Sequence, residues 1–289
     1  MSEPSIKIDV IKGEGLATLL PSNNVRLLID ADMLLYRACW ATNEKPFFEA
    51  QGSFSLMMNA IIEELDSDDY ICYFSGKGNI RNEVYPWYKA NRKDKEKPVH
   101  LAKLREWVEK NYPSESQDGL EADDLIADNM VAGDPFNASG IGTHASKTTI
   151  CVTQDKDLLQ LEGWNYNFVD KKLVWQDKRS AEFMFNCQLI TGDRVDNIPG
   201  LSEKRPKKGI GPAGAVKLLK PNYLDKGLQD LDVLSLYTEK YGEEYGTYMM
   251  WLNWYMLKVG STGREKVLEM LSQKRGQMTD DKFEELING

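Results

Sequence analysis

Short apolar runs alternate with longer amphipathic stretches along the first two thirds of the chain. The short runs are rich in β-branched or aromatic residues, so they predict buried strands. These runs lie at residues 25–29, 70–74, 148–153, 164–169 and 172–175. Apolar positions at helical spacing predict helices from Met33, over 56–65 and over 102–110. Strands that alternate with helices favour an α/β fold with a mainly parallel sheet.

From Ser180 onward the apolar positions keep helical spacing to the end of the chain, interrupted by loops at 191–212 and at Gly260–Gly263. We therefore predict an α/β core over residues 1–185 and a C-terminal helical subdomain over residues 186–289. Three polar, Gly-rich or charged stretches predict exposed loops. They lie at residues 76–99, 114–119 and 133–147.

The composition fits a globular intracellular protein. The chain has 289 residues, and 42% of them are hydrophobic, which is enough for a substantial core. No apolar stretch is long enough to cross a membrane, and the polar start lacks the core of a signal peptide, so a cytoplasmic location is expected. No coiled coil or exposed apolar stripe demands an oligomer, so a monomer is expected.

The cysteines and histidines of the chain limit which catalytic and metal sites it can form. The four cysteines are isolated from one another and lie mainly in apolar segments, so we expect buried, reduced thiols. The chain has only two histidines. This disfavours a zinc site built from His and Cys, and it disfavours a nucleophile activated by His.

The formal net charge of −9 does not exclude a nucleic-acid partner, because the acids are clustered. Two basic runs stand apart from them, at residues 89–97 and 204–208. Such runs can neutralise phosphates, although a solvated surface face is the alternative for either run alone.

The acids occur in four tight groups beside apolar runs. Asp30 directly follows one predicted strand and Asp155 follows another. Both are therefore expected at the edge where the carboxyl ends of parallel strands meet a ligand. The eight acids are Asp30, Glu121, Asp123, Asp124, Asp155, Asp157, Asp193 and Asp196.

Carboxylates a few ångströms apart need a cation, because like charges at that distance cannot all ionise unaided. Oxygen ligands favour Mg²⁺ or Mn²⁺ over zinc. We therefore predict a site for two such ions and phosphodiester hydrolysis by metal-activated water, which needs no side-chain nucleophile. For any single pair of acids the alternative is helix capping, since acids are favoured in first helical turns.

The segment GIGPAG at residues 209–214 places glycines just before a predicted helix. Such a turn exposes backbone N–H groups that can bind a phosphate. With the lysines around it, the segment predicts a non-specific contact to a DNA backbone, together with a monovalent cation such as K⁺. A tight turn between two helices is the structural alternative, and the two are compatible. The residues concerned are Lys207, Lys208, Gly209, Gly211, Gly214 and Lys217.

Six stretches of the chain form one ordered series over about residues 25–220. They are LLIDADMLLYRA, YPWYKANR, GLEADDLIA, TQDKDLLQL, ITGDRVDNIPG and GIGPAGAVKLL. Together they resemble the 5′-nuclease or flap endonuclease family, in particular its bacterial and bacteriophage 5′→3′ exonucleases, which include the exonuclease domain of DNA polymerase I. The resemblance implies a PIN-like core, a helical arch at about 77–112 and a helix–three-turn–helix at about 191–220.

The resemblance also implies roles for single residues. The first ion would be served by Asp30, Glu121, Asp123 and Asp155, the second by Asp157, Asp193 and Asp196, with Asp124 close to both. Lys89 and Arg92 would steer the scissile phosphate and stabilise transition-state charge, and Tyr88 would stack on a base. The implied substrates are 5′ flaps and nicked or 5′-ended duplex DNA, and the implied protein partners are replication proteins.

The chain departs from the family pattern at three places. Relatives usually carry an Asp at the end of the second strand, whereas here that strand runs into Ser75, which would orient a water but supplies no charge. We interpret Asp32 as a helix N-cap rather than as an extra acid beside the ions. The basic loop LSEKRPKK, residues 201–208, is longer than is usual.

Two other functions stay open at this point. A ribonuclease of the PIN-like class would use the same acids, although GIGPAG suits duplex DNA better. A structure-specific DNA-binding protein with impaired catalysis is the other, and Ser75 is the residue that motivates it.

Overall fold

The computed structural model describes residues 9–12, 25–92, 94–130, 148–201, 210–226 and 230–275. The chain packs as two units, each of which is described by itself. The described residues of the first, which we call the sheet unit, fall within 9–79 and 96–178. Those of the second, the helical unit, fall within 80–95 and 179–275.

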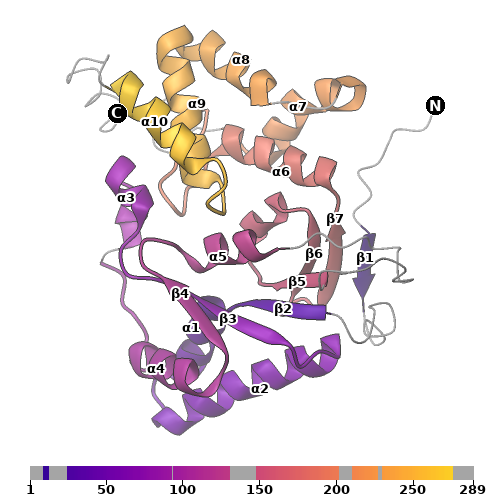
Figure 1. Cartoon of the computed structure of the whole chain (residues 1–289), viewed down its shortest axis with the longest axis vertical. Helices are drawn as coiled ribbons and strands as arrows, with labels where there is room; N and C mark the ends of the chain where they lie inside the picture. The colour runs from indigo at the N-terminus through magenta and orange to yellow at the C-terminus, as the bar shows by residue number, and fades with distance from the viewer. Residues whose placement is uncertain are drawn as a thin grey trace. The chain divides into compact units, whose positions relative to one another are not determined.

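Seven strands form the sheet of the sheet unit within the described residues, in the order β1-β7-β6-β5-β2-β3-β4 (Figure 1). All neighbouring pairs from β6 to β4 are parallel, and β7 runs antiparallel to both β6 and β1. The predicted mainly parallel sheet is therefore confirmed. The strands are β1 (Asp9–Lys12), β2 (Val25–Asp30), β3 (Tyr70–Ser75), β4 (Ser114–Gln117), β5 (Thr148–Val152), β6 (Gly163–Asn167) and β7 (Lys172–Gln176).

The core of the sheet unit lies between the middle strands and three helices. Leu27 and Ile29 of β2 pack with buried side chains of α1, α2 and α4, among them Leu34 and Phe54. Leu28 is also fully buried and lies on the opposite face, as strand alternation requires. The helices of this unit are α1 (Ala31–Ala41), α2 (Phe47–Leu65), α4 (Leu101–Asn111) and α5 (Ala122–Asn129), with the 3₁₀ turn η3 (Lys156–Gln160).

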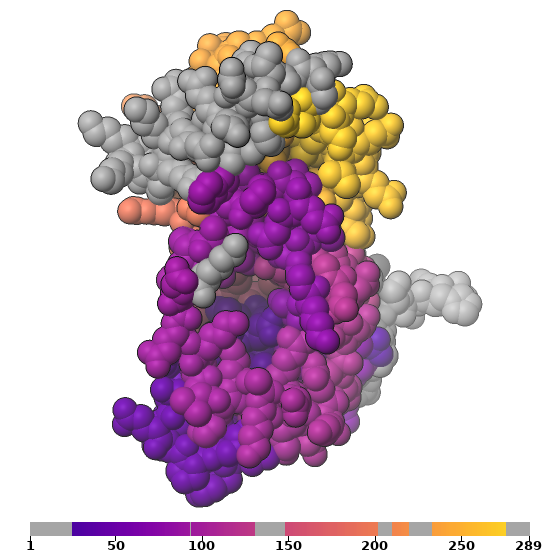
Figure 2. All heavy atoms as spheres, turned by 90° about the vertical axis from the view of Figure 1, so that its left-hand side faces the viewer, coloured from indigo at the N-terminus to yellow at the C-terminus, as the bar shows by residue number. Residues whose placement is uncertain are grey.

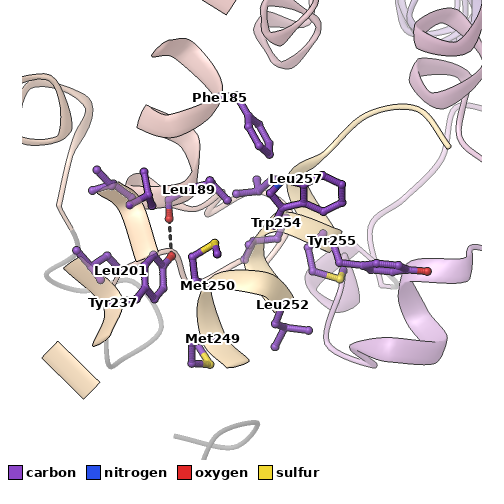
Figure 3. Close-up of a cluster of buried hydrophobic side chains, with 14 of the residues drawn as sticks. Phe185, Leu189, Leu201, Tyr237, Met249, Met250, Leu252, Trp254, Tyr255 and Leu257 are labelled. Atoms are coloured by element: carbon purple, nitrogen blue, oxygen red, sulfur yellow. Dashed lines mark hydrogen bonds between the residues drawn. The ribbon is translucent and has the colours of Figure 1, made fainter. Parts of the chain in front are cut away.

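Helix α9 forms the centre of the helical unit. Its side chains are buried almost all round, which is typical of a helix enclosed by other elements (Figure 3). Beside it the Tyr237 hydroxyl donates to the Leu189 carbonyl at 2.5 Å. The elements of this unit are α3 (Ile80–Val84), η2 (Ala90–Arg92), α6 (Lys178–Thr191), α7 (Pro212–Lys226), α8 (Asp230–Tyr241), α9 (Glu243–Leu257) and α10 (Arg264–Arg275).

Two predicted loops differ from the structure. Residues 114–117 form the edge strand β4, whose four side chains are all exposed, so no alternation of apolar and polar residues marks it. Within the stretch predicted as exposed, Arg81, Tyr85 and Tyr88 are at most 4% exposed. Their spacing of four and three residues is that of one helical face, which the surrounding charges and glycines obscured.

The packing division also differs from the predicted one at two points. The predicted boundary lies between residues 185 and 186, whereas the change of unit falls at 178/179, where α6 begins. The predicted arch at about 77–112 is shared: residues 80–95 pack with the helical unit, and α4 packs with the sheet unit. The purple atoms of residues 80–92 lie beside the yellow atoms of the C-terminal helices in Figure 2.

Two expectations from composition can be checked directly. The four cysteines are buried and form no disulfide, which confirms the prediction of reduced thiols. Among the helices of the described residues, none combines the length and the apolar character that a membrane crossing needs.

Candidate functional site

Asp30 and Asp155 meet at the carboxyl ends of two neighbouring parallel strands, β2 and β5. The link between them is Thr153: its hydroxyl donates to Asp30 Oδ2 at 2.9 Å and accepts the N–H of Asp155 at 3.0 Å. Asp30 Oδ1 also accepts the N–H of Met33 at 3.3 Å, which makes Asp30 the N-cap of α1. The structure thus brings together two acids that lie 125 positions apart in the sequence.

Asp155 also caps a helical turn. Its Oδ1 accepts the N–H of Asp157 at 2.9 Å, at the start of η3. Asp157 lies in the first turn of η3, five residues after the end of β5 at Val152. Asp155 therefore caps η3 and also lies at the edge of the sheet, because β5 leads directly into η3.

The interpretation of Asp32 as a helix N-cap is wrong, because Asp30 holds that position. Asp32 instead lies in the first turn of α1, and its Oδ2 accepts the N–H of Ser75 at 2.8 Å. Ser75 ends β3, so this hydrogen bond ties the start of α1 to the end of the neighbouring strand. A carboxylate therefore stands beside Ser75, where the strand itself supplies none.

Ser75 connects four elements of the sheet unit. Besides its bond to Asp32, its hydroxyl accepts the N–H of Ala122 at 3.2 Å, and its carbonyl accepts Nη1 of Arg105 at 2.7 Å. These contacts join α1, α4 and the start of α5 to the end of β3. Ser75 is thus a structural junction, whether or not it contacts a ligand.

Glu121 and Asp124 form a capping box at the start of α5. The Glu121 carboxylate accepts the N–H of Asp124, and Asp124 Oδ2 accepts the N–H of Glu121 at 3.2 Å. Asp124 is fully buried. The capping alternative therefore holds for this pair, and Asp123 lies between the two in the first turn of the helix.

Two carboxylates of the sheet unit, Asp30 and Asp32, have a raised pKa, and burial is the main cause for both. Burial, with the charges of Asp32 and Asp155, raises the pKa of Asp30 to about 7. Burial likewise raises the pKa of Asp32, aided by the charge of Glu121 and opposed by hydrogen bonds from Ser75 and by Arg105. A divalent cation near Asp30 would remove this conflict of charges, and the all-oxygen donor set suits Mg²⁺ or Mn²⁺.

Asp123 belongs to the same neighbourhood. Burial is the main cause that raises the pKa of the Cys151 thiol in β5, and the charges of Asp30, Asp155 and Asp123 raise it further. In the described part of the chain, however, no three Asp, Glu, His or Cys side chains surround one point closely enough to hold an ion as they stand. The donor chemistry fits a cation, and these side chains would have to move towards one another to bind it.

Two of the predicted site acids, Asp193 and Asp196, belong to the helical unit and lie in one tight loop. Asp193 Oδ1 accepts the N–H groups of Val195 at 2.6 Å and Asp196 at 3.2 Å. The loop closes through backbone hydrogen bonds between Asp193 and Ile198. The backbone of Gly192 (φ +63°) lies so close to this loop that an added Cβ would sit 2.3 Å from the Ile198 carbonyl oxygen.

Asp196 is the partner of both predicted cationic residues. Lys89 Nζ lies 3.5 Å from Asp196 Oδ2, and Arg92 pairs with Asp196 Oδ1. The Tyr88 hydroxyl donates to the same carboxylate at 3.4 Å. Tyr88 is 4% exposed, so the prediction that its ring stacks on a base does not fit its burial. Its ring lies instead 4.9 Å from Lys89 Nζ.

The predicted DNA-backbone segment is described only in part. Lys207, Lys208 and Gly209 lie outside the described residues. Gly211 and Gly214 flank the start of α7, where the Gly211 carbonyl accepts the N–H groups of Gly214 and Ala215. Lys217 is exposed on the first turns of that helix.

Sequence reasoning missed several residues around these acids. Thr153 follows β5 directly, and a hydroxyl beside two strand-end acids is the signal that would have pointed to it. Arg81 and Asn253 carry no comparable signal, because their bonds go to backbone groups distant in sequence.

Comparison with known proteins agrees with the mainly parallel sheet of this fold. The family model described as "5′-3′ exonuclease, N-terminal resolvase-like domain" matches residues 25–186, more than half of the chain. The chain belongs to this family of 5′-3′ exonuclease domains.

Curated relatives include proteins named 5′-3′ exonuclease and proteins named DNA polymerase I. The 5′-3′ exonuclease of Bacillus subtilis is 26% identical over 242 residues, 74% of this chain and 76% of that protein. DNA polymerase I of Rhizobium leguminosarum is 33% identical over 155 residues, and that of Borreliella burgdorferi is 28% identical over 236 residues. These matches cover 48% and 72% of this chain but only 14% and 24% of the two polymerases.

Solved structures share the fold. The T5 5′-exonuclease with bound divalent metal ions (zinc) has a TM-score of 0.55 and 18% identity, over 87% of this chain and 99% of that one. The bacteriophage T5 flap endonuclease, in a pseudo-enzyme–product complex with DNA and metal ions, has a TM-score of 0.53 and 18% identity. The second match covers 88% of this chain and 100% of that one.

Proposed function

We propose that this chain is a divalent-metal-dependent 5′-nuclease that hydrolyses phosphodiesters of branched or 5′-ended DNA. The observation that carries the proposal is the pair Asp30 and Asp155 at adjoining strand ends, where burial and neighbouring carboxylates raise the pKa of Asp30 to about 7. Family membership supports the same reaction class. A fold by itself does not fix a reaction, so the acids carry the argument.

In this proposal four acids of the sheet unit, Asp30, Glu121, Asp123 and Asp155, hold or support the first ion. The charges of Asp30, Asp123 and Asp155 all act on Cys151, and the charge of Glu121 acts on Asp32, which supports this grouping. Asp157, Asp193 and Asp196 are proposed for the second ion, with Asp124 close to both. Mg²⁺ or Mn²⁺, when bound, supplies Lewis-acid chemistry that activates water and offsets charge on the phosphate. Thr153 keeps Asp30 and Asp155 in a fixed relation by bonding to both.

Lys89 and Arg92 are proposed to bind the scissile phosphate and to stabilise the charge that builds on it. Both cations are paired with Asp196. A phosphate would therefore compete with that carboxylate for them. The proposal predicts that the ion pairs with Asp196 weaken the binding of Lys89 and Arg92 to a DNA phosphate.

The duplex is proposed to contact the backbone N–H groups around Gly211 and Gly214, with Lys217 and the lysines before the segment. A bound K⁺ there, a monomeric state, a cytoplasmic location and contacts to replication proteins all belong to this proposal. They rest on the resemblance and on composition.

The test is cleavage of a labelled 5′-flap DNA with Mg²⁺ or with EDTA. Asp155→Asn is expected to abolish cleavage and leave DNA binding largely intact, whereas Asp170→Asn serves as a matched control, since Asp170 is exposed and pairs only with Lys172 among the ion pairs of the described residues. Full turnover by Asp155→Asn, or turnover in EDTA, would defeat the proposal. Faster cleavage of an RNA flap than of DNA would favour the ribonuclease alternative.

A further inference from the structure

We propose that helix α9 positions the cationic residues Lys89 and Arg92 through two buried side chains, Arg81 and Asn253. The inference rests on the proposed function for its catalytic meaning, and on contacts within the helical unit for its geometry. It gives a role to the C-terminal helices, for which the sequence offers no motif.

Arg81 ties the segment that carries the cations to the C-terminal end of α9. Its Nε donates to the Met256 carbonyl at 3.0 Å and its Nη2 to the Lys258 carbonyl at 3.0 Å. Arg81 is 1% exposed, and its guanidinium lies 5.7 Å from the centre of the Tyr88 ring. The last carbonyls of a helix lack partners within the helix, so a buried cation is well suited to bind them.

Asn253 ties the acidic loop to the middle of the same helix. Its Oδ1 accepts the N–H of Gly200 at 2.9 Å, and its Nδ2 donates to the Met249 carbonyl at 2.8 Å, one turn back along α9. Asn253 is 1% exposed. Gly200 (φ +64°) comes so close to Gly192 that an added Cβ would lie 2.3 Å from the Gly192 nitrogen. Fixing Gly200 therefore fixes both ends of the loop.

The loop and the cationic segment are joined directly. Lys89 N–H donates to the Asp196 carbonyl at 3.0 Å, and the Asn197 side chain donates to the Trp87 carbonyl at 3.0 Å. Asn91 Nδ2 donates to the Val195 carbonyl at 3.1 Å. Helix α9 thus contacts the cationic segment, residues 81–92, directly through Arg81. It also contacts the acidic loop, residues 192–200, through Asn253, and this loop is hydrogen-bonded to the segment.

This support has a specific task at Lys89. Lys89 has a φ of +53°, a left-handed conformation that is strained for a residue with a Cβ. Such a conformation persists only where its surroundings impose it. The hydrogen bond from the Lys89 N–H to the Asp196 carbonyl is one contact that holds this conformation, and it depends on the loop staying in place. Arg81 and Asn253 are therefore positioning residues that act through the placement of Lys89.

The test compares Asn253→Ala with Asn186→Ala. Asn186 is a matched control: it is 2% exposed, belongs to the same unit, and its amide donates one turn back to the Glu182 carbonyl. In the described part of the chain its Oδ1 has no hydrogen-bond partner. Hydrogen–deuterium exchange of residues 85–92 is the first readout, and it needs no activity. Asn253→Ala is expected to speed exchange there about tenfold or more, and Asn186→Ala to leave it unchanged.

Single-turnover cleavage of a 5′-flap DNA is the second readout. Asn253→Ala is expected to lower the rate by about tenfold or more while the DNA Kd changes less than about threefold, because a small misplacement of a reacting group is costly. In a Lys89→Ala background the same substitution should cause little further loss. Additive losses, or equal effects of Asn253→Ala and Asn186→Ala on exchange, would overturn the proposal.

Arg81→Lys provides a second route if Asn253→Ala does not fold. Lysine keeps the charge and much of the buried stem but cannot reproduce the two-pronged contact to both carbonyls. It is expected to speed exchange at residues 85–92 and slow cleavage in the same way, and unchanged exchange would count against the proposal. If the native protein cleaves no DNA at all, the proposed function fails, and the exchange comparison still decides whether α9 positions the segment.

Discussion

The raised pKa of Asp30 predicts a protein that loses stability as the pH rises, as long as no divalent ion is bound. The folded-state pKa is about 7 and the ordinary value is 3.8, so the folded state keeps the proton over a range where the unfolded chain has released it. The contribution of Asp30 is fully present below about pH 4 and is lost as the pH rises through 7. At about 1.4 kcal/mol per pKa unit, the full loss is on the order of 4 kcal/mol.

Urea unfolding in EDTA measures this effect at two pH values. Between pH 5 and pH 8, Asp30 alone is expected to lower the free energy of unfolding by about 2–3 kcal/mol. Asp30→Asn should remove this fall in unfolding free energy between pH 5 and pH 8. Asp32→Asn should remove only part of it, because burial raises the pKa of Asp30 more than the Asp32 charge does. Asp170→Asn should leave the slope as it is, since Asp170 is exposed.

Magnesium should reverse the loss at pH 8, because an ion bound only to the folded state stabilises it by mass action. If the native protein and Asp30→Asn show the same dependence of unfolding free energy on pH in EDTA, Asp30 is not the group responsible. Equal stabilisation of both proteins by Mg²⁺ at pH 8 would show that the ion does not bind at Asp30.

Three further substitutions test separate parts of the account. Lys89→Ala is expected to slow flap cleavage by roughly 10²-fold with little change in duplex affinity; equal losses in both would make Lys89 only an electrostatic contact. Gly192→Ala should lower the free energy of unfolding by about 1–3 kcal/mol, since its Cβ would meet backbone 2.3 Å away; an unchanged urea midpoint would contradict this. Asp124→Ala should cost about 1–2 kcal/mol through the lost capping box, with loss of cleavage only if Asp124 also serves the ions.

The sheet could be predicted from the sequence because its inner strands are short, apolar and bounded by polar residues. The strands at 25–29, 70–74 and 148–153 are present within a residue or so of the predicted ends. The edge strand β4 could not be found in this way, since none of its side chains is buried. Strands that bury nothing leave no mark in the hydrophobic pattern.

The acids were predictable as a group but not in their individual contacts. Asp30 and Asp155 stand at strand ends, so the topology of a parallel sheet was enough to bring them together. The bond between Asp32 and Ser75 joins residues 43 positions apart, and no local pattern marks it. The same holds for Arg81, whose partners lie about 175 positions away. Contacts of a side chain to a distant backbone group leave no periodic signal in the sequence.

The burial of Tyr88 shows how a motif can mislead about one member. Its neighbours Lys89 and Arg92 are partly exposed, and both pair with the Asp196 carboxylate. Tyr88 stands in the same short motif, yet it packs in the core of the helical unit. All three side chains reach the Asp196 carboxylate, but the Tyr88 ring is buried, so a shared motif does not imply a shared role.

Everything proposed for this chain depends on divalent cations binding to the carboxylates around Asp30 and Asp155. Calorimetric titration of Mn²⁺ into the native protein, Asp155→Asn and Asp170→Asn measures that binding. Saturable binding is expected for the native protein and Asp170→Asn, and markedly weaker binding for Asp155→Asn. If all three proteins bind Mn²⁺ equally, or the native protein binds none, these carboxylates are not the metal site.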